Sequence, residues 1–193
     1  MDQLRDTHVV LVPAWNDAMG QPVLPTAPLS LEAPESIRAR VTMVSNPSTF
    51  VVGGVVFGVT STDVMGNLNR GETTVLRGTP GAGPKTEKLP RLLQHVLEQQ
   101  CFFPIFPPPP MDVDGGVPLE LLQMWHMGLP LAPDVLLAPS KLLKAFSKPI
   151  GATLAVNPGT LAVGNRGGTY ARLTIYPPTD AHKTTGTLVV GWD

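Results

Sequence analysis

Apolar residues occur along the chain in short runs that are typical of strands and are separated by proline or glycine. The first run, residues 8–12, is rich in valine and stops at a proline, which predicts a buried strand. Residues 41–44 alternate weakly between apolar and polar positions and indicate another strand. Two further runs, residues 50–52 and 55–57, flank Gly53-Gly54, where a two-residue turn with positive φ predicts a hairpin.

Helical periodicity is clearest after Lys88. Apolar side chains there recur at i, i+3, i+4, i+7 and i+8, which predicts an amphipathic helix that ends before Cys101 and holds Pro90 in its first turn. Residues 60–63 offer N-cap side chains for a short helix that reaches about Asn67. A short helical segment is predicted near residues 119–124.

The second half of the chain mixes both kinds of element. Residues 134–138 predict a buried strand, and residues 139–146 predict a helix with proline near its first turn. Three further strands are predicted at residues 152–156, 169–176 and 187–192. We therefore expect an α/β (α+β) fold in which helices cover one part of a mixed sheet.

Proline and glycine punctuate the connections, with 22 Pro and 19 Gly in 193 residues. Residues 21–34 carry four prolines and predict an extended surface segment. Residues 71–85 predict a flexible loop, and residues 104–118 a Pro/Gly-rich connector. The Pro107-to-Pro110 run within that connector favours polyproline II, which serves as a rigid spacer or as a docking motif for SH3 and WW modules.

Charge and apolar content narrow the function classes. The net charge of -1 offers no basic surface for many phosphates, so autonomous nucleic-acid binding is not expected. No run is long enough to span a membrane, and the start lacks the apolar core of a signal peptide, so we expect a soluble intracellular protein. The single cysteine excludes an internal disulfide and a structural zinc site made of this chain's thiolates alone.

No catalytic constellation is visible in the residue pattern. The four histidines, at positions 8, 95, 126 and 182, have no metal-ligand spacing, and His95 is expected on the solvated face of its helix. Cys101 precedes two phenylalanines and is expected to pack as a small apolar side chain. The carboxylates of residues 112–114 indicate a solvated loop, and Arg172 either faces solvent or is paired.

Several strings, read in order, carry a resemblance to a known family. They are Phe-Gly-Val-Thr-Ser-Thr-Asp at residues 57–63, Pro-Asp-Val-Leu-Leu-Ala-Pro-Ser at 133–140, Asn-Pro-Gly at 157–159 and Gly-Thr-Tyr-Ala-Arg at 168–172. From about residue 8 to the end, the chain resembles the B (second, accessory) subunits of DNA polymerase alpha. The resemblance implies a calcineurin-like phosphoesterase fold, a sandwich of mixed sheets flanked by helices, of which residues 1–193 are the C-terminal portion.

Active relatives of that fold hold a metal pair at strand ends, and the resemblance implies that this chain has lost those ligands. Where active enzymes have Gly-Asn-His-Asp, this chain places Trp15 and Asn16, and Phe57 stands where His is expected. Ser140 and Leu142 occupy the positions of a late Gly-His-x-His. Indole cannot coordinate such cations, and an amide is a poorer ligand than imidazole. We therefore expect no metal, no cofactor and no catalytic residue.

The resemblance also implies a role and partners. We expect a non-catalytic scaffold subunit of the nuclear DNA polymerase alpha-primase complex, acting in the initiation of DNA replication. It would bind the C-terminal region of the catalytic subunit and, through it, primase, with at most indirect DNA contact and no membrane. A portion of this kind is expected to expose strand edges and apolar surface. Two alternatives are an active metal-dependent phosphoesterase with displaced ligands and a free-standing adaptor that uses the proline run.

Overall fold

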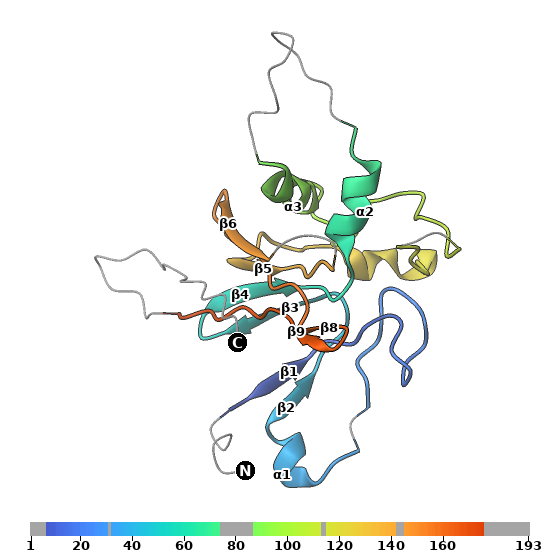
Figure 1. Ribbon diagram of the computed structural model, residues 1–193. Coiled ribbons are helices and arrows are strands. Elements are labelled where there is room, and N and C mark those ends of the chain that lie inside the picture. Colours follow the sequence, from blue (N-terminus) through green and yellow to red (C-terminus); the bar gives the residue numbers. More distant parts are fainter. Residues whose placement is uncertain (1–6, 31, 74–86, 113–114, 142–144, 176–193) are drawn as a thin grey trace, which may run out of the picture.

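Five strands form the central sheet of the computed structural model, which describes residues 7–30, 32–73, 87–112, 115–141 and 145–175 (Figure 1). The strand order is β3-β4-β5-β7-β6. The inner strands β4, β5 and β7 run parallel, while β3 and β6 pair antiparallel with their neighbours at the two edges. The bounds are β3 Ser48–Val52, β4 Val55–Val59, β5 Val135–Leu137, β6 Phe146–Ile150 and β7 Thr153–Asn157. The predicted mixed sheet is confirmed.

The hairpin between β3 and β4 forms where the sequence predicts it. Gly53 and Gly54 have φ of 58° and 83°, values that favour glycine because a side chain in this region meets its own backbone. The turn sets the register in which Phe50 lies opposite Phe57, and the two rings stack with centroids 5.8 Å apart. The two glycines therefore determine which apolar side chains share one face of the sheet.

Helices α2 (Val64–Gly71) and α3 (Lys88–Glu98) cover one face of the sheet, as Figure 1 shows. The apolar stripe of α3 buries Leu92, Leu93 and Val96 in the main core, which also contains Leu136 and Ala155 of the sheet. A 3-10 helix, η2 (Leu121–Met127), adds Met127 to this core. The predicted amphipathic helix and the flanked-sheet architecture are thus confirmed.

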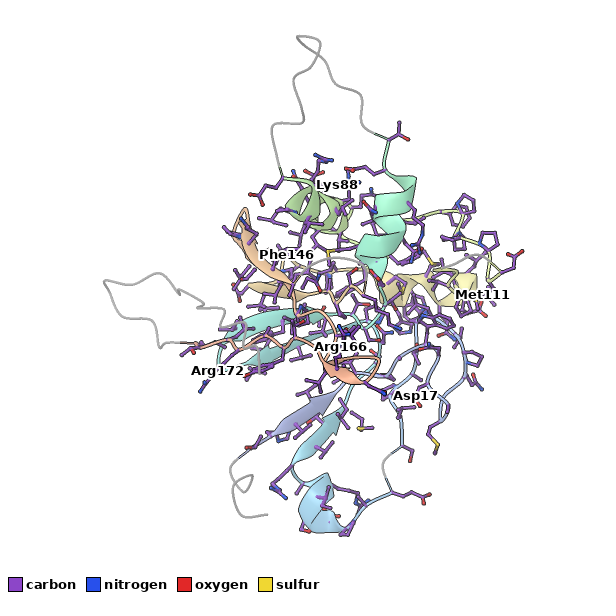
Figure 2. The ribbon with its side chains drawn as sticks, in the orientation of Figure 1. Asp17, Lys88, Met111, Phe146, Arg166 and Arg172 are labelled. Carbon is purple, nitrogen blue, oxygen red and sulfur yellow. The ribbon has the colours of Figure 1, made fainter. Side chains whose placement is uncertain are left out.

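The opposite face of the sheet carries a second core. Phe57, Val59, Val135 and Val156 form its buried cluster, and Val12, Ala171 and Leu173 pack against it. The strand predicted over residues 169–176 is wrong for the described residues 169–175, which contain no regular strand. Ala171 and Leu173 of this segment pack against the second core, so the segment covers apolar side chains of the sheet. Arg172 is exposed and points away from the sheet (Figure 2).

A small parallel sheet stands apart from the central one. Strands β1 (Val9–Leu11) and β2 (Val41–Met43) pair with each other, and the short helix α1 (Glu35–Arg38) precedes β2. The prediction that the first strand is buried is wrong, since Val9 is 39% and Leu11 42% exposed. Two strands alone cannot cover both of their own faces, so apolar side chains remain at the surface.

Two further predictions need correction. The helix expected over residues 139–146 is absent from the described residues 139–141 and 145–146, because Phe146 begins β6 and pairs with Asn157 of β7. The segment 21–34 is not wholly a surface segment, since Leu24 is fully buried in the main core. Its backbone N–H donates to the carbonyl of Pro118, which draws the segment inward.

The remaining elements are short or lie outside the described residues. A two-stranded hairpin joins β8 (Ala162–Val163) and β9 (Arg166–Gly167), and Gly164 in its turn has a φ of 60°. The strand predicted at residues 187–192 and most of the loop predicted at 71–85 fall outside the described residues. Within the described part of the chain, no helix has the length and apolar character needed to cross a membrane.

Candidate functional site

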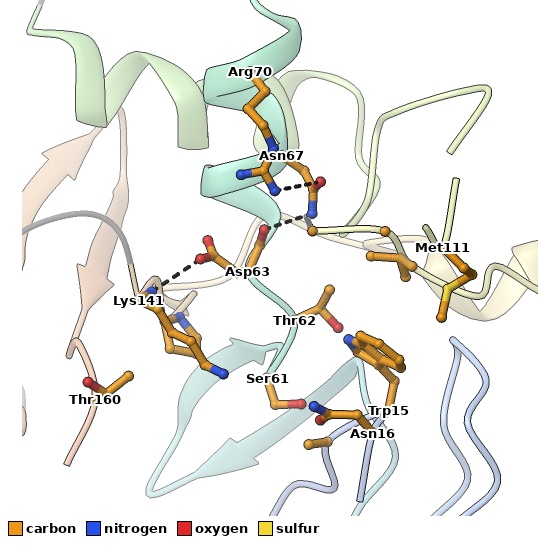
Figure 3. A pocket seen from close by; sticks show the side chains of 15 residues that line it. Trp15, Asn16, Ser61, Thr62, Asp63, Asn67, Arg70, Met111, Lys141 and Thr160 are labelled. Carbon is orange, nitrogen blue, oxygen red and sulfur yellow. Dashed lines mark hydrogen bonds between the residues drawn. The ribbon is translucent and has the colours of Figure 1, made fainter. Parts of the chain in front are cut away.

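A cavity of about 520 Å³ lies where the carboxyl ends of several strands meet (Figure 3). The segments that follow β1, β4, β5 and β7 all reach it, since Asn16, Thr62, Lys141 and Thr160 each line its wall. Carboxyl ends of parallel strands form one edge of a sheet, which is the usual place for ligands in such folds. The other lining residues are Ala14, Trp15, Ser61, Asp63, Asn67, Arg70, Met111, Gly115, Gly116, Val117 and Pro139.

The loop after β4 is held in place by Asn46, which is fully buried. The Asn46 Oδ1 accepts hydrogen bonds from the Thr60 hydroxyl and the Ser61 backbone N–H, both at 3.0 Å. The Asn46 Nδ2 donates to the Thr62 Oγ1 at 3.2 Å. The Ser61 hydroxyl in turn donates to the carbonyl of Pro13 at 2.6 Å. One amide and three hydroxyls therefore shape this part of the cavity wall.

The loop after β5 depends on a second buried amide, that of Asn157. Its Oδ1 accepts from the backbone N–H groups of Ser140 and Gly159, each at 2.9 Å. Gly159 has a φ of 73°, and the turn it makes brings the chain back toward the cavity. Backbone N–H groups that are shielded from water need an acceptor, and here one side-chain oxygen accepts from two of them.

Asp63 is the only carboxylate among the described residues that line the cavity. One of its oxygens accepts from the backbone N–H of Gly66 at 2.8 Å, which caps the N-terminus of α2. The other accepts from the backbone N–H of Lys141 at 3.1 Å and so ties α2 to the loop after β5. Both oxygens therefore already serve structural hydrogen bonds, and the sequence prediction of N-cap side chains here is confirmed.

Two cationic side chains line the same cavity. Arg70 lies in the last turn of α2 and donates to the Asn67 Oδ1 at 3.4 Å. Lys141 is exposed, and Figure 3 shows its side chain extending toward Ser61 and Asn16. Among the described residues, neither cation forms an ion pair. With one carboxylate against two cations, the described wall is net positive.

This donor set does not fit a pair of divalent metal ions. A two-metal centre needs several carboxylate, histidine or cysteine ligands around ions that lie a few ångströms apart. In the part of the chain that the structure describes, no group of three or more such residues could hold a metal ion. The nearest approach to a ligand is Asp63, whose oxygens are engaged with backbone N–H groups.

The residues singled out from the sequence fall in different places. Trp15 and Asn16 line the cavity, whereas Phe57 lies within β4 in the second core. Ser140 is 2% exposed, and its Oγ has no hydrogen-bond partner among the described residues. Leu142 lies outside the described residues. Of the four residues in this set that the structure describes, two therefore lie at the cavity wall.

Sequence reasoning missed the two asparagines that organise the site. Residues 45–48 and 157–159 contain Asn-Pro steps, which indicate turns but say nothing about the partners of the amide side chains. The signal that could have found them is the run of hydroxyl residues at 60–62, which needs an acceptor once it is buried. Arg70 was also missed. Cations are common in the last turn of a helix, where they interact with the helix dipole, so Arg70 does not by itself indicate a binding site.

His95 and Cys101, which the sequence analysis considered, do not line the cavity, and His95 lies beside an ion pair of α3. Arg91 of α3 forms a two-pronged ion pair with Glu72, at 2.7 and 3.0 Å, and lowers the pKa of that carboxyl mainly through this hydrogen bond. His95 lies 3.6 Å from the same carboxylate and is 36% exposed, so it is less solvated than expected. Cys101 is half-buried, and desolvation raises the pKa of its thiol, in keeping with a packing role.

Comparison with known proteins identifies the family. The sequence profile of the DNA polymerase alpha/epsilon B subunit matches residues 1–148. The chain belongs to this family. The resemblance drawn from the strings at the strand ends is therefore confirmed. Two of those strings, residues 57–63 and 133–140, include parts of β4 and β5 together with the loops that follow them.

Several relatives in this family are much longer than this chain. The DNA polymerase alpha B subunits of Rattus norvegicus and of Mus musculus are each 34% identical over 168 residues, which is 86% of this chain and 26% of the relative. The DNA polymerase alpha B subunit of Drosophila melanogaster is 32% identical over 173 residues, which is 89% of this chain and 26% of the relative. The chain spans about a quarter of the length of these relatives.

Proposed function

We propose that this chain acts as a non-catalytic accessory part of DNA polymerase alpha in the nucleus, in the initiation of DNA replication. Membership of the B-subunit family and the names of its relatives support this assignment. In this proposal the chain binds the C-terminal region of the catalytic subunit and, through it, meets primase. Contact with DNA is at most indirect, which agrees with the net charge of -1.

The non-catalytic character rests on the engagement of Asp63. The strand-end cavity has the location of an active site, yet its lone described carboxylate gives both oxygens to backbone N–H groups. Amide and hydroxyl hydrogen bonds from Asn46 and Asn157 hold the surrounding loops, so their shape does not depend on a metal ion. We propose that residues 1–193 belong to the C-terminal portion of a phosphoesterase-like domain that serves as a scaffold.

Measurements on the purified chain test the catalytic part of this proposal. Elemental analysis is expected to find less than stoichiometric Mn, Zn or Fe, and hydrolysis of a phosphodiester with added Mn²⁺ is expected to stay at the rate of the buffer. A stoichiometric metal pair together with metal-dependent turnover would overturn the proposal. If turnover is found, Asn16→Ala shows whether it arises at this wall. A site that includes Asn16 would lose turnover in that variant.

Co-purification tests the binding part. A tagged copy of the chain expressed in cells of its source is expected to recover the polymerase alpha catalytic subunit, identified by mass spectrometry. Recovery of other proteins without that subunit would contradict the assignment. Deletion of Pro107 to Pro110 tests the adaptor alternative. That alternative requires the deletion variant to recover the polymerase as before and to lose a different partner.

A further inference from the structure

The proline run from Pro107 to Pro110 has no part in the strand-end cavity, and Figure 1 shows its segment looping out at the margin of the molecule. We propose that residues 106–112 are a docking motif for a protein module that recognises polyproline II with an aromatic-lined groove whose rim is basic. This contact goes beyond the proposed scaffold function and does not depend on it, because a linear motif and a polymerase contact can coexist in one chain.

The exposure of the four prolines follows the period of polyproline II. That helix has three residues per turn, so Pro107 and Pro110 share one edge of it, as the two prolines of a P-x-x-P ligand do. Pro107 and Pro110 are exposed, whereas Pro108 and Pro109 are half-buried. The edge that a groove would receive is therefore free, and the protein itself covers part of the other prolines.

The run also offers the groups that an aromatic groove recognises. Phe106, directly before the prolines, is 74% exposed and adds an aromatic ring to the contact. Proline has no backbone N–H, so its carbonyl is its only polar backbone group. Among the described residues, none donates a hydrogen bond to the carbonyls of residues 107–109, which leaves these acceptors for the indole N–H or phenol O–H of a groove.

The fold holds one end of the run in place. The backbone of Pro110 packs directly against Gly116, where an added Cβ would collide with the Pro110 carbonyl. The proline rings restrict the backbone as well, because each one fixes its own φ. A ligand that is ordered before it binds loses less conformational entropy on binding, which favours recognition of so short a segment.

The charge along the segment selects the kind of groove. Residues 92–140 contain no lysine or arginine, and Asp112 and Asp114 follow the prolines closely. Asp112 is exposed. A groove with a basic rim is complementary to this acidic flank, whereas an acidic rim would repel it. An EVH1 domain with a basic rim is therefore the expected type of partner, in preference to an SH3 domain with an acidic rim.

Titration calorimetry of the purified chain with an isolated EVH1 domain of basic rim tests the proposal. Binding is expected, and Pro107→Ala and Pro110→Ala are each expected to weaken it about fivefold or more, the usual effect of losing an anchoring side chain. Pro108→Ala is the matched control, because it removes the same kind of ring from a half-buried position, and it is expected to change the affinity less than about twofold. Circular dichroism verifies that each variant is folded.

Asp112→Lys tests the charge argument. Reversal of this charge is expected to weaken binding to the EVH1 domain several-fold at low salt, about as expected for one charge near a basic rim, and the loss is expected to shrink as salt is added. Glu32→Lys is the matched control, since it makes the same change at an exposed position before α1. The proposal is overturned if the EVH1 domain does not bind at submillimolar concentration, if Pro108→Ala weakens binding as much as Pro107→Ala, or if an SH3 domain with an acidic rim binds more tightly.

Discussion

Replacing Asn46 with leucine removes the hydrogen bonds of the loop after β4 while nearly preserving side-chain volume. The Ser61 N–H and the Thr60 hydroxyl then lose their shared acceptor, and the Thr62 Oγ1 loses a donor, all in a region where Asn46 itself is fully buried. Each unsatisfied buried group costs about 1–3 kcal/mol. With the Thr60 hydroxyl still accepting from Thr62, we expect Asn46→Leu to lower the free energy of unfolding by about 2–5 kcal/mol.

Urea denaturation followed by circular dichroism measures this loss, and Asn46→Asp is the matched control. Aspartate keeps two acceptor oxygens at the same position, so it is expected to retain the bonds from Thr60 and Ser61 and to lose less stability than leucine. The slope of the unfolding transition is expected to stay constant, so the midpoint alone reports the change. A loss below about 0.5 kcal/mol for Asn46→Leu would refute the view that this amide holds the loop.

Three other substitutions test separate parts of the structure. Leu93→Ala, in the fully buried stripe of α3, is expected to lower the free energy of unfolding by about 2–5 kcal/mol, and a loss under about 1 kcal/mol would show that the stripe is not the core. Ser140→Ala removes a buried hydroxyl without a described partner and is expected to leave urea stability unchanged or raised by up to about 1 kcal/mol, whereas a clear loss would reveal a missed partner. Glu72→Gln is expected to lower the urea midpoint at pH 7. Because the pKa of Glu72 is lowered in the folded state, chiefly by the hydrogen bond from Arg91, its contribution is present above the ordinary glutamate pKa of 4.5 and is lost as pH falls below it. An equal difference between variant and parent at pH 7 and pH 3 would contradict this reasoning.

Local sequence patterns correctly predicted the elements that form because of residues close together in the chain. The hairpin followed from two adjacent glycines that both adopt positive φ, and α3 followed from an apolar stripe that needs only a core to face. The helix prediction at residues 139–146 was wrong. The spacing of its leucines carries no information about β7, and Phe146 pairs with that strand. Tertiary pairing decided that segment against its local pattern.

The candidate site was only partly predictable for a related reason. Its location at strand ends followed from the family resemblance, and Trp15 and Asn16 were found there. The bonds that shape it join residues 15 and 17 positions apart, from Asn46 to Ser61 and from Ser140 to Asn157. The two cations that line the cavity come from α2 and from the loop after β5. Their shared position depends on how separate elements pack, and the periodicity of the sequence does not predict it.

The central claim, that the chain is a scaffold which binds the polymerase, is tested most directly by mixing it with the C-terminal region of the catalytic subunit of DNA polymerase alpha. Size-exclusion chromatography with light scattering then reports the mass of each species. We expect one co-eluting complex whose mass is the sum of one 20.5 kDa chain and one catalytic-subunit fragment. Separate elution of the two proteins at micromolar concentration, with the chain folded by circular dichroism, would contradict the claim.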